Sequence, residues 1–207
     1  IDTGWGDSNS ISKTIQEFSK AGCAAVHIED QVFDKRCGHR PNKQIVSILE
    51  MRDRLKVALD SKTHESFFIM ARTDALASEG MNGAIERCGE YLDEGADGIF
   101  LEAVTSIDQY KEFKNIFSAP LLANITEFGK TPLFTQAELN AAGVDMVLYP
   151  LTAFRAMSQS AENVYNSVIK DGTQEPLLDI MQTREELYEV LDYYNFEKKL
   201  DDKLSKE

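Results

Sequence analysis

The sequence predicts a protein of the α/β class, in which the strands of one parallel sheet alternate with helices. Three short apolar runs, at 23–29, 96–102 and 144–149, each follow a glycine that ends a helical pattern. Two further apolar runs, at 67–71 and 120–124, lie in the intervals between them. Short, nearly continuous apolar runs are typical of parallel strands covered by helices, and glycine lets the chain turn from a helix into the next strand.

The spacing of apolar residues predicts helices between these strands. Apolar residues recur at helical intervals over 48–59 and 107–117, and more weakly over 84–91. Beyond residue 149 the alternation stops, and residues 152–170 and 184–204 are predicted to form helices with no strand between them. The C-terminal part of the chain is therefore expected to be purely helical.

Two arrangements of the sheet fit these predicted strands. Ile1-Asp2 precedes a glycine-rich turn and is interpreted as the end of a strand whose beginning is missing. An open sheet would fit, but the even alternation and the polar strand ends favour a (β/α)8 barrel of the TIM type that is N-terminally incomplete. We expect residues 1–207 to form a single partial barrel domain. A barrel without its first strands exposes sheet edges, so this chain alone is expected to aggregate and to be inactive.

Composition narrows the classes of function. Residues 1–207 carry 22 basic and 35 acidic side chains, a net charge of −13, which disfavours binding to nucleic acid or to anionic lipid. No apolar run approaches the roughly 18 residues that a membrane span needs. The three cysteines, Cys23, Cys37 and Cys88, have no metal-ligand spacing and are odd in number, which favours a reduced, cytoplasmic location. Cys23 and Cys88 have apolar neighbours and are expected in the core.

Polar residues follow the successive strand ends, and in a barrel the carboxyl ends of the strands meet at one face. A single polar strand end more often caps a helix, but a succession of them favours a shared site. The acidic residues Asp2, Glu29 and Glu102 would converge there, and carboxylate oxygens suit Mg²⁺ better than zinc. Pairing with Arg72 explains Glu102 about equally well.

A basic segment, Lys35 to Arg40, surrounds Cys37 and contains Gly38 and His39. Nearby positive charge stabilises a thiolate, and a local cluster of cations in an acidic protein favours a multiply anionic ligand. The alternative is a solvated basic loop with an incidental cysteine. Guanidinium groups bind carboxylates through paired hydrogen bonds, so the arginines at 72, 155 and 184 are candidate carboxylate clamps.

Taken together, the motifs resemble the isocitrate lyase and phosphoenolpyruvate mutase superfamily. The resemblance rests on His27 to Gln31, Lys35 to His39 and Ala71 to Ala75. The segments 124–132, 149–155 and 181–188 look like those of its 2-methylisocitrate lyases, and the resemblance covers essentially the whole chain. The sequence departs from the superfamily at its start, where the first strands and the first aspartate of a metal-binding pair are absent.

This resemblance implies a Mg²⁺-dependent carbon–carbon lyase that cleaves 2-methylisocitrate to pyruvate and succinate in the methylcitrate cycle of propionate catabolism. It implies that Cys37 is the catalytic acid and that Asp2 and Glu29 are metal ligands. It further implies a homotetramer in which residues of about 174–207 pack on, or are exchanged with, a neighbouring subunit. The implied substrate contacts are Cys37, Gly38, His39, Arg72, Glu102, Asn124, Ile125, Thr126, Arg155 and Arg184.

Three alternative functions stay open at this point. An isocitrate lyase or a dimethylmalate-type lyase of the same superfamily would use similar residues. A dicarboxylate-binding protein without enzymatic activity could use the same arginines, but it would have no need of a thiol among cations. The identity of the alkyl group depends on pocket shape, since one methyl group is worth only about 1–3 kcal/mol.

Overall fold

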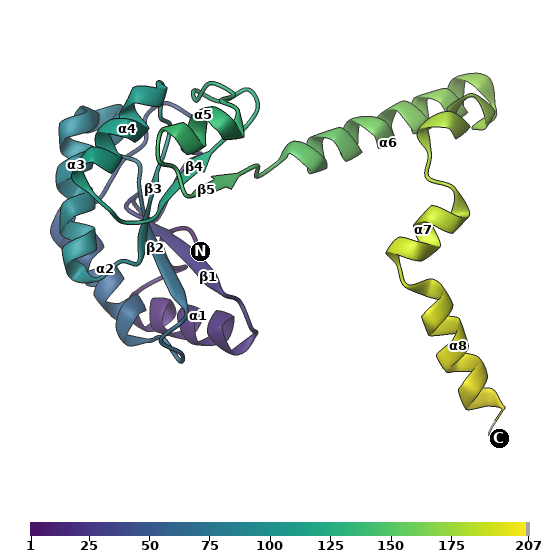
Figure 1. Cartoon of the computed structure of the whole chain (residues 1–207), viewed down its shortest axis with the longest axis horizontal. Coiled ribbons are helices and arrows are strands. Elements are labelled where there is room, and N and C mark those ends of the chain that lie inside the picture. Colours follow the sequence, from purple (N-terminus) through teal and green to yellow (C-terminus); the bar gives the residue numbers. More distant parts are fainter. Residues whose placement is uncertain (206–207) are drawn as a thin grey trace. The chain divides into compact units, whose positions relative to one another are not determined.

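The computed structural model describes residues 1–205, and five strands form its only sheet in that range (Figure 1). All neighbouring strands are parallel, and their order in the sheet is their order in the chain. The predicted α/β class is confirmed, with the parallel sheet curled into a half-barrel. The strands are β1 (Ala25–Glu29), β2 (Phe68–Thr73), β3 (Gly98–Leu101), β4 (Leu121–Asn124) and β5 (Met146–Leu148).

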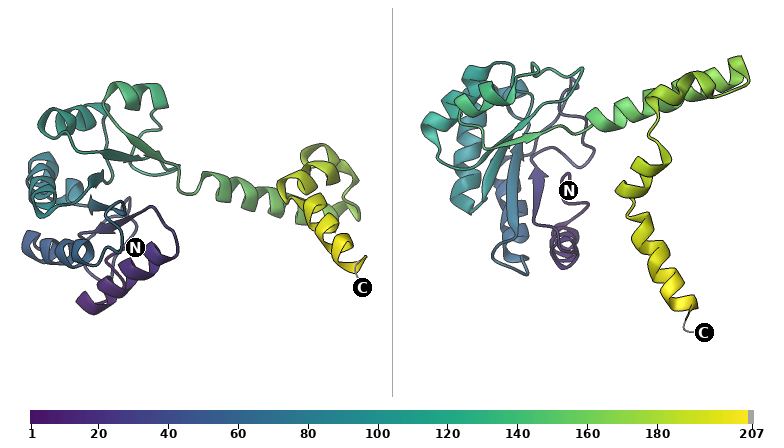
Figure 2. Two further views of the ribbon diagram at one scale, coloured as in Figure 1. Left: turned by 60° about the horizontal axis from the view of Figure 1, so that its bottom comes forward. Right: turned by 45° about the vertical axis from the view of Figure 1, so that its right-hand side comes forward.

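Helices line the outer side of the curved sheet (Figures 1 and 2). Helix α1 packs on α2, α2 on α3, and α4 on α5. The predicted glycine turns precede β1, β3 and β5, because Gly22, Gly95 and Gly143 have φ of 87°, 114° and 83°, which glycine adopts without steric cost. These helices are α1 (Ser8–Lys20), α2 (Ile48–Asp60), α3 (Leu76–Glu94), α4 (Ile107–Ile116) and α5 (Gln136–Ala141).

The chain divides into two compact units, Ile1–Thr152 and Ala153–Glu207. The predicted helix over 152–170 is confirmed as α6, and no strand follows β5 up to residue 205. The predicted helix over 184–204 is wrong in one respect. It is two helices, because Asp192 between them adopts a left-handed φ of 53°. The C-terminal elements are α6 (Thr152–Asp171), a 3-10 helix (Glu175–Ile180), α7 (Arg184–Val190) and α8 (Tyr193–Leu204).

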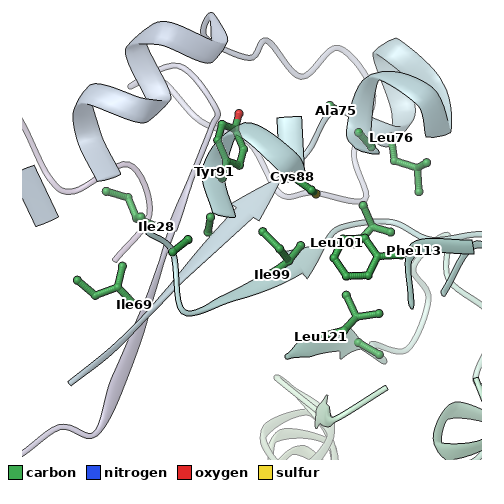
Figure 3. Packing of buried hydrophobic residues seen from close by; sticks show 14 of the residues in the cluster. Ile28, Ile69, Ala75, Leu76, Cys88, Tyr91, Ile99, Leu101, Phe113 and Leu121 are labelled. Atoms are coloured by element: carbon green, nitrogen blue, oxygen red, sulfur yellow. The ribbon is translucent and has the colours of Figure 1, made fainter. Parts of the chain in front are cut away.

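The outward-facing side chains of the strands form the hydrophobic core. Ile28, Ile69 and Ile99 are fully buried and pack with Cys88 and Tyr91 of α3 (Figure 3). Successive side chains of a strand point to opposite faces, so these alternate residues face the helices. The expected burial of Cys88 is confirmed, whereas the same expectation for Cys23 is wrong: Cys23 precedes β1 and is exposed.

The other set of alternating side chains faces the inside of the half-barrel. Glu29 is in register with Arg72, and Arg72 is in register with Phe100. His27 stacks edge-on against Phe100, with ring centroids 5.2 Å apart. The carboxyl ends of the strands therefore present charged side chains to a common inner face.

Residues 1 and 2 lie beside β1 without forming a strand of their own. The amino group of Ile1 donates to the carbonyl oxygen of His27 at 3.0 Å, and the amide of Glu29 donates to the carbonyl of Asp2 at 2.9 Å. This pairing brings Asp2 next to the carboxyl end of β1. Among the residues that the structure describes, no helix has the length and apolar character needed to cross a membrane.

Candidate active site

Arg72, near the end of β2, is the centre of a buried cluster of charges. Its Nε donates to Asp74 Oδ2 at 2.9 Å and lies 3.3 Å from Glu29 Oε2, and its Nη1 lies 3.6 Å from Glu102 Oε2. The guanidinium also covers the ring of Phe100 at 4.8 Å. Burial alone would lower the pKa of Arg72, but the charges of Glu102 and Asp74 outweigh it and raise that pKa. One permanent cation thus joins the ends of β1, β2 and β3.

Lys35 lies between the two predicted metal ligands. Its Nζ is 2.9 Å from Asp2 Oδ1 and 3.1 Å from Glu29 Oε1. Burial raises the pKa of Glu29 despite the nearby charges of Arg72 and Lys35. The pKa of Asp2 is lowered, chiefly by the hydrogen bond from Lys35. The position between these carboxylates therefore attracts a cation.

The donor set at this position fits a hard divalent cation in part. Both carboxylate oxygens of Glu29 are buried, and they face the cationic groups of Lys35 and Arg72 without a well-formed hydrogen bond. Carboxylate oxygens are the ligands that Mg²⁺ prefers. Within residues 1–205 no group of three or more His, Cys, Asp or Glu side chains could hold a metal. Asp2 and Glu29 can thus supply two ligands, and the remaining ones must come from elsewhere.

Glu102, directly after β3, holds His39 over the inner face. His39 Nε2 lies 3.0 Å from Glu102 Oε1, and the backbone amide of Lys130 donates to His39 Nδ1 at 2.9 Å. Because Nδ1 accepts, the proton of the neutral ring lies on Nε2 and points to Glu102. Asn124 Nδ2 donates to the other oxygen, Oε2, at 3.3 Å. The burial of Glu102 would raise its pKa, but the hydrogen bond from His39 and the charge of Arg72 lower it.

The cysteine loop, defined here as residues 35–40, is fixed on both sides of Cys37. Before Cys37, the buried side-chain amide of Gln31 donates to the backbone carbonyl of Arg36 and accepts from its backbone N–H. After it, Gly38 lies so close to Glu102 that a Cβ at this position would meet Oε1 at 2.3 Å. His39 then makes the contact with Glu102 described above. Cys37 itself is exposed, so its thiol stands at the surface of a loop whose backbone is held.

A second buried network fixes the strand ends from the helix side. The carboxylate of Asp30 accepts hydrogen bonds from Thr73 Oγ1 at 2.7 Å, the Asp74 amide at 2.9 Å and Tyr91 OH at 2.9 Å. Arg87 of α3 lies 3.6 Å from the same carboxylate and also donates to Tyr91 OH. Burial raises the pKa of Asp30. This network holds the ends of β1 and β2 in the register that places the charged cluster.

The predicted site residues fall into two groups. The residues of unit 1, from Asp2 to Thr126, lie at the strand ends or in the cysteine loop. Ile125 differs from the others because its side chain belongs to the hydrophobic core. Arg155 lies in α6 and Arg184 begins α7, so both belong to the second unit.

Sequence reasoning did not assign roles to three residues of this site. Asp74 binds Arg72 and also Lys43, at 2.7 Å. Lys35 joins Asp2 to Glu29, and Gln31 fixes the loop. All three lay inside segments that carried the resemblance, which is the signal that could have identified them.

Comparisons with known proteins place this geometry in context. Residues 1–169 match the family described as phosphoenolpyruvate phosphomutase. The chain is 56% identical to the 2-methylisocitrate lyase of Shewanella oneidensis over 207 residues, which are 100% of this chain and 71% of that protein. It is similar to a crystal structure of 2,3-dimethylmalate lyase, with a TM-score of 0.87 and 30% identity over 98% of this chain and 67% of that one.

A second solved structure shares the fold at lower identity. It is a phosphonopyruvate hydrolase in complex with oxalate and Mg²⁺, with a TM-score of 0.82 and 24% identity. The alignment covers 96% of this chain and 69% of that chain. At this identity the likeness is one of fold.

Proposed function

The chain belongs to the phosphoenolpyruvate phosphomutase family, and within it to the 2-methylisocitrate lyases. Because of this membership, we propose that the protein cleaves 2-methylisocitrate to pyruvate and succinate. In this reaction a base takes the proton of a hydroxyl group, the adjacent carbon–carbon bond breaks as that oxygen becomes the carbonyl of pyruvate, and the carbanion left on succinate takes up a proton from an acid. The pathway would be the methylcitrate cycle of propionate catabolism.

The observation that carries this function is the fixed cysteine loop. Cys37 is exposed and lies between two anchored residues, Arg36 and Gly38. Protonating a carbanion requires a donor at a defined position, and such general acid catalysis is typically worth about 10²–10⁴-fold. Cys37 is proposed to donate its thiol proton to the succinate carbon as the bond breaks. A protein that only binds dicarboxylates would have no use for this placement.

The substrate is proposed to bind across the inner face, where the anionic carboxylates of 2-methylisocitrate would meet guanidinium and amide donors. The guanidinium of Arg72 already donates two hydrogen bonds to Asp74, so a substrate carboxylate would have to share it with Asp74. The proposed substrate contacts are Cys37, Gly38, His39, Arg72, Glu102, Asn124, Ile125, Thr126, Arg155 and Arg184.

Mg²⁺ is the proposed cofactor, held in part by Asp2 and Glu29. The superfamily is one of Mg²⁺-dependent enzymes, and the buried lone pairs of Glu29 agree with a ligand role. When bound, the cation would stabilise negative charge on the oxygen that becomes the carbonyl of pyruvate. Lys35 forms ion pairs with both carboxylates, so we propose that it releases them when Mg²⁺ binds.

The assembly of the whole protein is proposed from the family and from unit 2. We propose that the half-barrel is part of an eight-stranded barrel, and that residues of about 174–207 pack on, or exchange with, a neighbouring subunit of a homotetramer. No residue of α6, α7 or α8 is buried, and apolar side chains such as Ile169, Val190 and Phe196 are largely exposed. Exposed apolar surface of this kind is typical of protein–protein contacts. A cytoplasmic location, without nucleic-acid or membrane partners, stays a prediction.

One assay separates the proposed function from its alternatives. The whole protein should be tested with 2-methylisocitrate, isocitrate and 2,3-dimethylmalate, each with Mg²⁺ and with EDTA. We expect Mg²⁺-dependent release of pyruvate from 2-methylisocitrate at a kcat/KM well above those for the other two substrates. Preference for either of the others would reassign the substrate, and binding without turnover would favour a dicarboxylate-binding protein.

A further inference from the structure

We propose that Gln31 is a positioning residue for Cys37, an inference that rests on the catalytic role proposed above for this cysteine. Gln31 follows β1 by two residues and has no exposed surface. Its Nε2 donates to the carbonyl of Arg36 at 2.9 Å, and its Oε1 accepts from the amide of Arg36 at 2.9 Å. One side-chain amide thus uses both of its ends on the backbone of the residue immediately before Cys37.

The backbone of Gln31 is itself held in place by contacts with the rest of the half-barrel. The carbonyl of Gln31 accepts a hydrogen bond from Arg54 Nη1 at 2.8 Å, and Gln31 forms an antiparallel bridge with Ile45. Arg54 lies on α2, a helix of the core. Hydrogen bonds through Gln31 therefore fix the position of the Arg36 peptide relative to the core of the half-barrel.

The residues that follow Cys37 are held by Glu102, which comes directly after β3. Gly38 packs on the carboxylate of Glu102, and His39 contacts the same carboxylate at 3.0 Å. Cys37 is the single residue between the two anchors. Its backbone is held at both ends while its thiol stays exposed, as a proton donor to a bound substrate requires.

Only a side-chain amide provides this anchor. Glutamate keeps the acceptor for the Arg36 amide but places a second acceptor against the Arg36 carbonyl, and methionine offers neither bond at similar volume. Misplacing a reacting group by about 1 Å can cost on the order of 10²-fold in rate. Loss of the Gln31 anchor should therefore act on the proton transfer and leave the carboxylate-binding groups in place.

The test is a double-mutant cycle in the whole protein with Mg²⁺, using Gln31→Met and Cys37→Ser singly and together. We expect Gln31→Met to lower kcat by at least about tenfold, with KM and Tm nearly unchanged. In the Cys37→Ser background Gln31→Met should cause no further loss, because the group that it positions is already gone. Gln31→Glu, which keeps one bond but sets its other oxygen against the Arg36 carbonyl, should also lower kcat. The matched control is Gln44→Met, at an exposed glutamine whose backbone carbonyl accepts a hydrogen bond from the amide of Val32, and it should leave kcat unchanged.

Several outcomes would overturn the inference. They are a normal kcat for Gln31→Met, an equal loss in the two backgrounds, or a large drop in Tm for both Gln31 variants. A Cys37→Ser protein that turns over normally would instead refute the catalytic role of the cysteine, so the two failures are distinguishable.

Discussion

Replacing Glu29 with glutamine separates the proposed metal role of this carboxylate from a structural one. The side chain is fully buried and keeps its volume in the substitution. Its two cationic neighbours, Lys35 at 3.1 Å and Arg72 at 3.3 Å, do not become isolated. Lys35 retains Asp2 at 2.9 Å, and Arg72 retains Asp74 at 2.9 Å.

The expected effect on stability is therefore small. Leaving one partner of a buried ion pair uncompensated costs about 3–5 kcal/mol, and this substitution leaves none. Burial raises the pKa of Glu29, so the fold as a whole disfavours its charge. We expect the free energy of unfolding to change by no more than about 1 kcal/mol, or about 2–4 °C in Tm for a chain of this size.

The expected effect on metal binding is large. Changes to residues that only support a ligand cost about 10–100-fold in metal affinity, so loss of a ligand charge should cost at least as much. The assay is calorimetric titration of Mg²⁺ into the EDTA-stripped whole protein, with thermal melts in EDTA and Glu65→Gln, at an exposed position, as the control. A fall in Tm of about 10 °C or more with unchanged Mg²⁺ affinity would show that Glu29 is a structural ion-pair partner and refute this reasoning.

Three further substitutions test the charged cluster and the loop. Burial would raise the pKa of Asp74, but the charge of Arg72 outweighs it and lowers that pKa; Asp74→Asn should therefore be less stable than wild type above about pH 4, and urea melts should show the difference vanish as pH falls through the lowered pKa. Gly38→Ala would place a Cβ against the carboxylate of Glu102, so either the loop or this carboxylate must shift, and kcat should fall by on the order of 10²-fold with a normal thermal melt. Arg72→Lys keeps the charge but loses the paired hydrogen bonds, and calorimetry should show weaker binding of succinate.

Local patterns in the sequence were enough to predict the parallel sheet and the gathering of charged side chains at its strand ends. Near-continuous apolar runs and glycine turns mark the strands, and parity along them brings Glu29 and Arg72 to the same face. The pairing of these groups depends on contacts between distant segments, which periodicity does not contain. The bonds from Gln31 to Arg36 and from Lys35 to Asp2 depend on how the cysteine loop folds back onto β1. The break at Asp192 depends on one left-handed residue, and apolar spacing continues across it.

The kcat of the Cys37→Ser variant of the whole protein, with 2-methylisocitrate and saturating Mg²⁺, tests the central claim most directly. Serine keeps the size of the side chain but is a much weaker acid, so the loss should fall on the transition state and not on ground-state binding. We predict a fall in kcat of about 10²–10⁴-fold, with the dissociation constant for succinate nearly unchanged. A variant that releases pyruvate at the wild-type rate would contradict the account and leave the cysteine loop as an anion-binding element.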